Sequence, residues 1–447
     1  MSSVLIRGSL VAGHGHVDLL VEGNRIAAIG HGLQAGSAEI VEAPHALLWP
    51  GLVNTHHHLA QSLLKGLPSG IDLGLDDWLG AVPYKAWPHY TPEHLYHAAC
   101  AGLLELLRSG CTLCADHHYL YHAETSAEME EAVFQAASDV GIRLLLCRGM
   151  STTRGSHTGM RSTSLEPETL QQCVARLEAS ITRFHDDAPD AMQRVAVAPT
   201  SLMHACPPEH LRELAAFARD KQLLRHSHLL EIARDDLVAR EQHGLSAVDY
   251  AASVEWLEEG VWFAHLVNLS AAEVQQVAAA GVGMAHCPVS NCRLGSGIAP
   301  APALEEGGAL VSLGVDGAAS AENSSLVNEM MMAWLVHRAV GGSSASSVDQ
   351  VMRWATCNGA DLLGFGETGR LQVGGLADLV LYDLDQPRFS GLARPEWAPV
   401  ICGEPVIARD VMVNGQWRLR GGEPLGLDQA LATARARQSC QALLNAL

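Results

Sequence analysis

The sequence has little positive charge. Its 447 residues contain 29 Lys and Arg against 49 Asp and Glu, which gives a formal net charge of −20, and the only lysines are Lys65, Lys85 and Lys221. A protein of this sign repels the phosphate backbone of nucleic acids, and no stretch of the chain concentrates basic residues. We therefore do not expect a nucleic acid polymer as a partner.

Long apolar runs are also missing, although 48% of the residues are hydrophobic. No run reaches the roughly 18 residues that a membrane-spanning helix needs. Residues 1–7 lack the basic stretch and apolar core of a secretory signal. The 11 cysteines are an odd number scattered along the chain, which suits reduced thiols better than a disulfide framework. We expect a cytoplasmic protein with no membrane contact.

The phosphate-binding pattern GxGxxG does not open a helix after the first predicted strand, which argues against a dinucleotide fold. A β pattern stands there instead. Residues 1–50 alternate short apolar stretches with Gly, Asn and His turns, and matching stretches return at 377–382 and 411–417. We predict a small β-sandwich domain built from both chain ends, residues 1–50 and 366–447, with a terminal helix in the second part.

Between these ends, strand-like apolar runs alternate with helical stretches. Strands are predicted at residues 112–116, 143–147, 195–199, 223–228, 261–265, 282–286 and 309–316. Segments 208–221 and 271–280 have helical periodicity. Strand and helix units repeated over about 300 residues are typical of a TIM-type (β/α)8 barrel. We predict an α/β protein whose catalytic barrel spans residues 51–365.

Histidines gather where the predicted strands end. His56 and His58 lie two residues apart, and because side chains of a strand alternate between its faces, they point the same way while His57 points opposite. His226 shares a face with His228 and would lie deeper in the barrel. Chemistry in a parallel barrel takes place at the carboxyl ends of the strands. Those ends also carry His265, His286 and Asp316. The pattern indicates a metal site.

Several motifs of the chain resemble those of the amidohydrolase superfamily, in its mononuclear deaminase and chlorohydrolase branch. They are PGLVNTHHH at 50–58, HSHLLE at 226–231, FAH at 263–265, HCPVSN at 286–291 and LGVDG at 313–317. The segment GRLQVGGLADLV at 369–380 resembles the return of the superfamily chain into its β-domain. The resemblance covers nearly the whole length.

The resemblance implies a metal-ligand set made of His56, His58, His228 and Asp316. Three neutral imidazoles and one carboxylate suit one divalent ion, Zn²⁺ before Fe²⁺, and leave a position open for water. Other superfamily members bridge two metals with a carboxylated lysine on the fourth barrel strand. The corresponding segment here, residues 195–200, has no lysine, so a single metal is predicted.

The same resemblance implies hydrolytic deamination of a heterocyclic ring. Glu231 follows the ligand His228 by three residues and would carry a proton from water to the ring nitrogen. Asp316 would pass the remaining proton to the departing amine. His265 would donate a hydrogen bond to the attacking hydroxide or to the developing oxyanion.

The loops must determine which ring is bound. A flat ring with amide edges needs an aromatic or apolar slot and a few fixed donors and acceptors. Candidates for these substrate contacts are Gln61, Trp78, His118, Arg148 and His286. His286 also fits a position behind the ligands or in the core. Arg154 and Arg161, in the Gly- and Ser-rich stretch 151–164, are candidates for a lid over the ligand.

Within the branch, HHH at 56–58, DHHY at 116–119 and HCP at 286–288 most resemble enzymes that act on oxidised bicyclic heterocycles. These are 8-oxoguanine-like purines and isoxanthopterin-like pterins. Relatives active on 8-oxoguanine carry an aromatic pair where this chain has Leu59 and Ala60, which favours a pterin. The expected function is metal-dependent deamination of such a small molecule, with release of ammonia.

Alternatives remain open. The same metal set would serve a guanine or S-adenosylhomocysteine deaminase, a triazine chlorohydrolase or a cyclic amidase. A barrel that only binds would be expected to have lost ligands, and the sequence retains them all. The resemblance also leaves room for a homo-oligomer.

Overall fold

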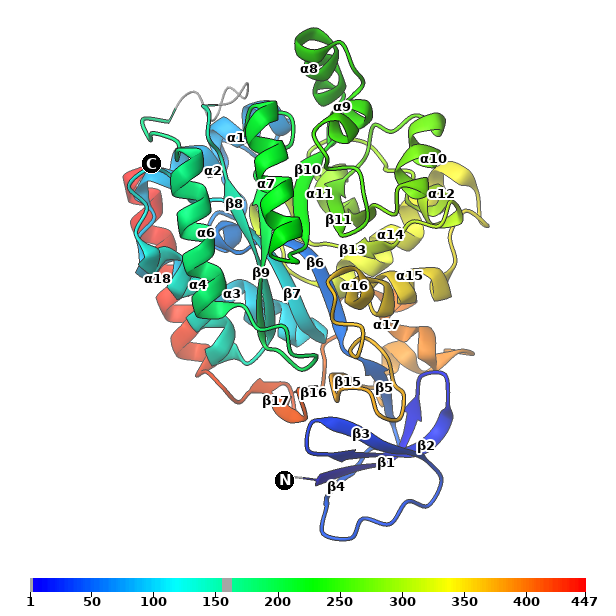
Figure 1. The fold of residues 1–447 in the computed structure, drawn as a ribbon. Coiled ribbons are helices and arrows are strands. Elements are labelled where there is room, and N and C mark those ends of the chain that lie inside the picture. The colour runs from blue at the N-terminus through cyan, green and yellow to red at the C-terminus, as the bar shows by residue number, and fades with distance from the viewer. Residues whose placement is uncertain (1–2, 155–162) are drawn as a thin grey trace.

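A parallel sheet forms the centre of the computed structural model, which describes residues 3–154 and 163–447 (Figure 1). Arg161, a predicted lid residue, lies outside the described residues. The strand order is β13, β12, β11, β10, β9, β8, β7, β6, β14. The bounds are β6 Leu52–His58, β7 Cys111–His118, β8 Arg143–Met150, β9 Gln193–Pro199, β10 Arg225–Leu229, β11 Val261–His265, β12 Gly283–His286, β13 Val311–Leu313 and β14 Asp316–Gly317. Since only residues 314 and 315 separate β13 from β14, the chain joins the two ends of the sheet, as in a TIM-type barrel.

Helices follow the barrel strands in the order expected of repeated strand and helix units. The first group is α1 Leu75–Ala81, α2 Pro83–Ala86, α3 Pro92–Ser109, α4 Ala127–Val140, α6 Leu170–Phe184, α7 Pro208–Asp220, α8 Arg234–His243, α9 Ala247–Ser253 and α10 Ala271–Ala279. The second group is α11 Pro288–Arg293, α12 Ala301–Glu306, α13 Ala318–Ala321, α14 Leu326–Gly341, α15 Val348–Trp354, α16 Cys357–Leu362, α17 Ala398–Cys402 and α18 Gln429–Ala446. The α/β class predicted from the alternation of apolar runs is confirmed.

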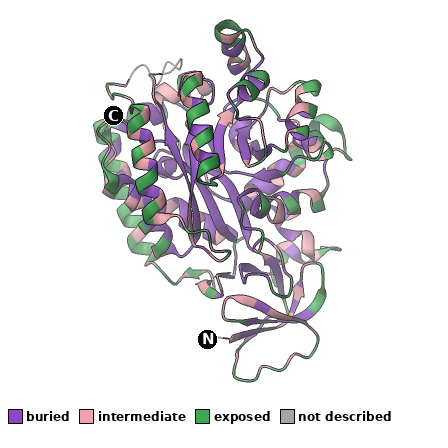
Figure 2. Cartoon of the chain, in the orientation of Figure 1, coloured by how far each residue is buried: buried purple, intermediate pink, exposed green. Residues whose placement is uncertain are grey.

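The barrel strands are apolar because both of their faces are covered. Val53, Leu113, Leu145, Ala196 and Trp262 pack together in a cluster contributed by β6, β7, β8, β9 and β11. The outer face of the sheet packs against helices whose other side meets water, as the purple strands and green helix surfaces of Figure 2 show. β7 and β8 are buried along their whole length.

Strands from both chain ends lie in a second sheet, drawn at the bottom of Figure 1. Its order is β18, β17, β16, β15, β5, β1, β2, β3, with β4 beside β1. The bounds are β1 Ser3–Val11, β2 Gly15–Glu22, β3 Arg25–Gly30, β4 Glu39–Glu42, β5 Ala46–Pro50, β15 Leu379–Asp383, β16 Asp410–Val413, β17 Gln416–Arg420 and β18 Glu423–Pro424. The antiparallel pair β5 and β15 joins the two chain ends. A two-layer β-sandwich stays a prediction.

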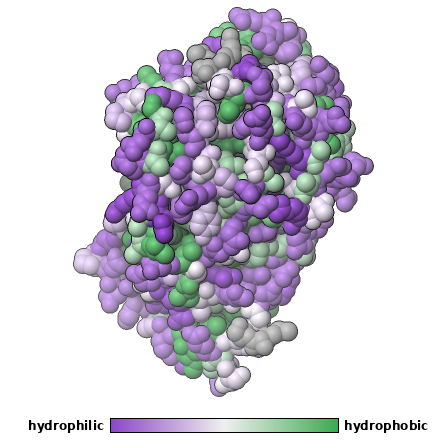
Figure 3. Space-filling model, turned by 90° about the vertical axis from the view of Figure 1, so that its left-hand side faces the viewer, coloured by the Kyte–Doolittle hydropathy of each residue, from purple (hydrophilic) through white to green (hydrophobic). Residues whose placement is uncertain are grey.

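The surface of the protein carries many polar side chains. The face shown in Figure 3 is mostly hydrophilic, with apolar side chains in small groups between polar ones. Within the described residues, no helix combines the length and the apolar character needed to cross a bilayer. The cysteines are free thiols, most of them buried.

A buried ion pair ties the barrel to the C-terminal strands. Arg143, the first residue of β8, donates through Nε and Nη2 to the two carboxylate oxygens of Asp378 at 2.8 and 3.0 Å. Both side chains are fully buried. Asp378 also accepts a hydrogen bond from the backbone N–H of Asn414 at 2.7 Å. Each charge is therefore compensated inside the protein.

Replacing Asp378 with Asn leaves the Arg143 guanidinium buried without its counter-charge. We expect the free energy of unfolding to fall by about 3–5 kcal/mol. Glu42→Gln is the matched control, since Glu42 pairs with Arg7 at the surface, where such pairs contribute about 0–1 kcal/mol. Urea-induced unfolding of the two variants measures the difference. Equal losses in the two variants would contradict this assignment.

Candidate active site and metal centre

The predicted ligands converge at the carboxyl end of the parallel sheet. His56 and His58 come from β6, His228 from β10 and Asp316 from β14, and their ligand atoms all lie within 4.8 Å of one another. Nε2 of His56 and Nε2 of His58 are 3.2 and 3.3 Å from Oδ1 of Asp316. Nε2 of His58 is 3.2 Å from Nε2 of His228. Four donor atoms from three strands thus surround one point.

Hydrogen bonds on the far side of two rings determine which nitrogen faces this point. Nδ1 of His58 donates to the carbonyl of His117 at 2.7 Å, and Nδ1 of His228 donates to the carbonyl of Thr200 at 2.6 Å. Because a carbonyl oxygen only accepts, both Nδ1 atoms carry the ring proton. The Nε2 atoms of His58 and His228 therefore present lone pairs to each other.

The third imidazole is oriented through His226. Nδ1 of His226 donates to the carbonyl of Trp262 at 2.9 Å, so Nε2 of His226 is an acceptor. That Nε2 lies 2.8 Å from Nδ1 of His56 and takes its proton in a hydrogen bond. His56 therefore also turns an unprotonated Nε2 toward the common point. His226 lies behind a predicted ligand, as its place in HSH predicts.

Such a set fits a divalent cation. Burial lowers the pKa of His56 to about 3 and also lowers the pKa values of His58 and His228, so all three rings are neutral. Burial opposes the ionisation of Asp316, but its contact with His56 and the charge of the nearby His265 outweigh burial and hold its pKa well below the usual range. Three lone pairs and a carboxylate oxygen this close repel one another unless a cation lies between them, and Zn²⁺ takes this donor set.

A second group of imidazoles lies deeper in the barrel. The nearest nitrogens of His56, His117 and His226 are also within 4.8 Å of one another. The hydrogen bond from His56 to His226 accounts for the closest of these contacts without a second ion. The geometry thus favours one metal rather than two.

Glu231 and His265 lie beside the predicted ligand Asp316, and the three side chains also have ligand atoms within 4.8 Å of one another. Nε2 of His265 is 3.5 Å from Oε2 of Glu231. Burial raises the pKa of Glu231 to about 7, although the charge of His265 acts against this shift. A carboxyl group with such a pKa can take up and release a proton near neutral pH.

Three residues at or beside the site have left-handed backbone conformations, which determine where the side chains of the site point. Leu230, His265 and Asp316 have φ values of 55°, 77° and 58°. Positive φ values are energetically unfavourable for residues other than glycine, and residues with such φ values cluster at functional sites. The side-chain amide of Asn268 donates to the carbonyls of Leu230 and Glu231 at 3.2 and 3.1 Å and stabilises one of these turns.

A cavity opens beside the predicted ligands, and it has both apolar and polar walls. Its apolar and aromatic walls are Leu75, Trp78, Leu79, Pro83, Tyr84 and Tyr119. Its polar walls, apart from the predicted ligands, Glu231 and His265, are Gln61, Thr200, Ser201 and Asp235. The mixture suits a flat ring with polar edges.

Two of the predicted substrate contacts line this cavity. Gln61 and Trp78 are both present, and Oε1 of Gln61 and Nε1 of Trp78 are buried with no partner among the described residues. Tyr84 and Tyr119 also line the cavity and were not predicted from the sequence. Tyr119 directly follows β7, so the strand-end rule could have found it, whereas Tyr84 lies on the short α2, in a segment without periodicity.

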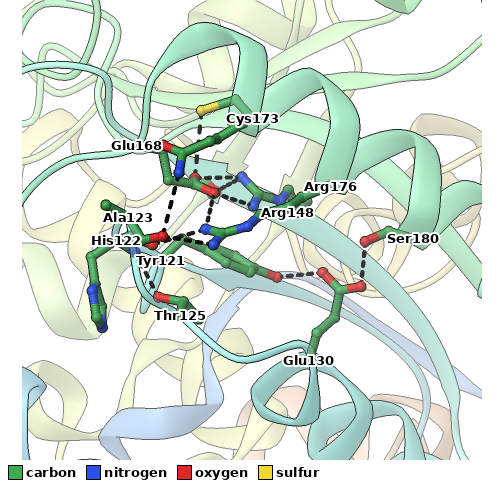
Figure 4. A network of polar contacts seen from close by, with 12 residues as sticks. Tyr121, His122, Ala123, Thr125, Glu130, Arg148, Glu168, Cys173, Arg176 and Ser180 are labelled. Atoms are coloured by element: carbon green, nitrogen blue, oxygen red, sulfur yellow. Dashed lines mark hydrogen bonds and ion pairs between the residues drawn. The ribbon is translucent and has the colours of Figure 1, made fainter.

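The other three predicted contacts do not line the cavity. Arg148 donates to both carboxylate oxygens of Glu168 at 2.8 and 2.7 Å and lies over the ring of Tyr121 (Figure 4). His118 packs edge-on against the same Tyr121 ring, with centroids 4.9 Å apart. Nε2 of His286 is 3.1 Å from Nε2 of His337 on α14. Their substrate role has no support from this geometry. Arg154 pairs with Glu166.

Known proteins resemble this chain over most of its length. The pattern of the amidohydrolase family matches residues 47–418, and the chain belongs to that family. An isoxanthopterin deaminase from an unknown prokaryotic organism is 40% identical over 401 residues, which cover 86% of this chain and 83% of that protein. The 8-oxoguanine deaminase of Pseudomonas aeruginosa is 37% identical over 433 residues, which cover 95% of this chain and 94% of that protein.

Solved structures share the fold over almost the whole chain. The zinc complex of an atrazine chlorohydrolase from Arthrobacter aurescens TC1 has a TM-score of 0.91 at 27% identity, with 98% of this chain and 100% of that chain covered. An amidohydrolase from an environmental sample of the Sargasso Sea has a TM-score of 0.84 at 35% identity, with 99% of each chain covered.

Proposed function

We propose that the protein is a metal-dependent deaminase that releases ammonia by hydrolysis of an oxidised bicyclic heterocycle, either an isoxanthopterin-like pterin or an 8-oxoguanine-like purine. The observation that carries the proposal is the meeting of three unprotonated Nε2 atoms and the Asp316 carboxylate at the floor of a cavity that also holds Glu231. The two deaminases at 40% and 37% identity support the reaction and the ring class.

The proposed metal is one zinc ion held by His56, His58, His228 and Asp316. When bound, it would supply Lewis-acid chemistry, lowering the pKa of a coordinated water to about 7. Glu231, with its own pKa near 7, takes a proton from the attacking water and gives it to the ring nitrogen beside the attacked carbon. Asp316 takes the second proton and passes it to the departing amine. His265 donates a hydrogen bond to the oxygen that develops negative charge.

The proposed catalytic unit is residues 51–365. β5 ends at Pro50 and β6, the first barrel strand, begins at Leu52. The remaining residues, 1–50 and 366–447, are proposed to form the small β-sandwich, to which both chain ends contribute strands. Free thiols suit the reducing cytoplasm, where we propose that the enzyme works on a small-molecule substrate.

Gln61 and Trp78 are the proposed substrate contacts. The free carboxamide oxygen of Gln61 can accept from a ring N–H, and the Trp78 indole supplies part of the aromatic wall. We expect Trp78→Ala to raise KM about 10-fold and to change kcat less than about 3-fold, because loss of an aromatic contact removes binding common to ground and transition states. Trp417→Ala, on the distant β17, is the control. An unchanged KM in Trp78→Ala would remove Trp78 from the binding site.

Chloride release from a triazine is the second candidate, because a zinc-bound atrazine chlorohydrolase shares the fold with a TM-score of 0.91. Its identity of 27% is lower than the 40% and 37% of the two deaminases. The same metal set would serve both reactions, and only the leaving group differs. Deamination is therefore the proposal that sequence similarity favours.

The test is a screen for ammonia release by the zinc-loaded protein. The substrates are isoxanthopterin, 8-oxoguanine, pterin, guanine, cytosine and S-adenosylhomocysteine, with atrazine assayed in parallel for chloride. We expect the highest kcat/KM with isoxanthopterin or 8-oxoguanine. Chloride release without ammonia release, or turnover confined to cytosine, would contradict the proposal.

A further inference from the structure

Two adjacent side chains of α11 contact the predicted catalytic groups from behind. α11 is the short helix that follows β12, and its residues Ser290 and Asn291 are fully buried. Neither lines the substrate cavity. The sequence motif HCPVSN includes both residues, and neither takes part in the proposed proton transfers.

Ser290 contacts the carboxylate oxygen of Asp316 that faces away from the predicted ligands. Its hydroxyl donates to Oδ2 at 2.6 Å, while Oδ1 lies near the imidazoles. Ser320 is also near Oδ2, at 3.1 Å, but its single proton has a closer acceptor in the carbonyl of Gly317 at 2.9 Å. Ser290 is therefore the main donor to Asp316. This hydrogen bond fixes the rotation of the carboxylate.

Asn291 acts on the neighbouring imidazole. Its Oδ1 lies 2.9 Å from Nδ1 of His265 and accepts that proton. The opposite nitrogen of the ring, Nε2, then faces Glu231 at 3.5 Å. Since His265 has a left-handed backbone and no neighbouring helical turn to hold it, this hydrogen bond sets the plane of the ring.

A hydrogen bond to a residue outside the site holds α11 in place. Glu329 of α14 is fully buried, and its Oε2 accepts a hydrogen bond from the backbone N–H of Val289 at 3.3 Å. A short helix of six residues would not hold two side chains in place alone, and this contact ties its first turn to the long α14.

We propose that Ser290 and Asn291 are positioning residues, Ser290 for the metal ligand Asp316 and Asn291 for the proton-handling His265. The inference rests on the proposed function and adds to it the residues that orient two of its groups. Hydrogen-bond partners behind metal ligands and catalytic groups change metal affinity or activity by about 10- to 100-fold. The two residues act without touching the substrate, so KM should change little.

The first test measures zinc affinity and kinetics of Ser290 variants. Competition between apoprotein and a chromophoric chelator gives the Kd for Zn²⁺. We expect Ser290→Ala to raise this Kd about 10-fold and to lower kcat about 10-fold at saturating zinc, with KM within about 3-fold. Ser290→Thr keeps the hydroxyl and should restore both values to within about 3-fold. Cys292→Ser, at an exposed position on the same helix, should behave as wild type.

Ser290→Cys covers the case in which the alanine variant does not fold. It keeps the size of the side chain but offers only a weak donor, so it should also lose zinc affinity. Wild-type zinc affinity in both Ser290→Ala and Ser290→Cys would overturn the role of Ser290.

The second test compares crystal structures of Asn291→Ala and Asn291→Asp. We expect the His265 ring to leave its present plane in Asn291→Ala and to keep it in Asn291→Asp, whose carboxylate still accepts from Nδ1. An unmoved ring and an unchanged kcat in Asn291→Ala would overturn the role of Asn291. If the wild-type enzyme deaminates none of the rings, the proposed function fails, while zinc affinity and ring orientation still decide this inference.

Discussion

His228→Ala and Asp316→Asn should each lower kcat by about 10³ or more, even when zinc is supplied in excess. His228→Ala removes one of the four atoms that surround the proposed ion, and Asp316→Asn replaces the charged carboxylate with a neutral amide. The amide introduced by Asp316→Asn would in addition be unable to take the proton that the mechanism assigns to the carboxylate. The other ligands cannot compensate, because Nε2 of His56 and of His58 already face the same point.

The measurement pairs steady-state ammonia release with the zinc content of the same preparation. His94→Ala changes a half-buried histidine of α3 that belongs neither to the ligand group nor to the cavity wall, and it should keep both wild-type activity and wild-type zinc content. A His228→Ala or Asp316→Asn enzyme that holds zinc and retains near-full activity would refute the assignment of these ligands.

Glu231→Gln should lower kcat by about 10² or more and leave the zinc content unchanged. The amide has nearly the same size as the carboxyl group but can neither accept nor release the proton that must travel from water to the ring. Glu231 is not among the predicted ligands, since His56, His58, His228 and Asp316 form that group without it. The variant thus separates proton transfer from metal binding.

Glu213→Gln, at an exposed position of α7, is the matched control and should leave both kcat and zinc content unchanged. KM of the Glu231→Gln enzyme should stay within about 3-fold of wild type, because the proton transfer is made only in the transition state. A Glu231→Gln enzyme with wild-type kcat would eliminate Glu231 as the proton carrier.

Barrel strands such as β11 and β12 could be predicted from the sequence because they are apolar runs that end in a polar residue, His265 and His286. β11 occupies the predicted residues 261–265, and α7 and α10 each end within one residue of the predicted segments. The predicted ligands converge for the same reason, since parallel strands bring their carboxyl ends to one edge.

Strand alternation explains why three of the predicted substrate contacts do not line the cavity. Ala115, Cys147 and Ala285 pack in the cluster inside the barrel, so the positions an even number of residues after them face the site. His118 and Arg148 are an odd number of positions from these inward residues and therefore point outward. His286 directly follows Ala285 and points outward to α14 for the same reason. The alternation is present in the sequence, whereas the predicted contacts depend on strand ends alone.

His265 shows why alternation is not sufficient. Phe263 belongs to the outer core, so a regular strand would also turn His265 outward. Its φ of 77° turns the side chain into the cavity instead, and no pattern in the sequence reports that conformation. The place of Tyr84 in the cavity wall could not be predicted either, because this residue lies on the short helix α2, whose position depends on tertiary contacts.

The most direct test of the account is a crystal structure of the zinc-loaded enzyme recorded at the zinc absorption edge. We expect one anomalous peak about 2.0–2.2 Å from Nε2 of His56, His58 and His228 and from a carboxylate oxygen of Asp316. A protein that binds zinc with no peak at this point, or with its peak among His56, His117 and His226 instead, would contradict it.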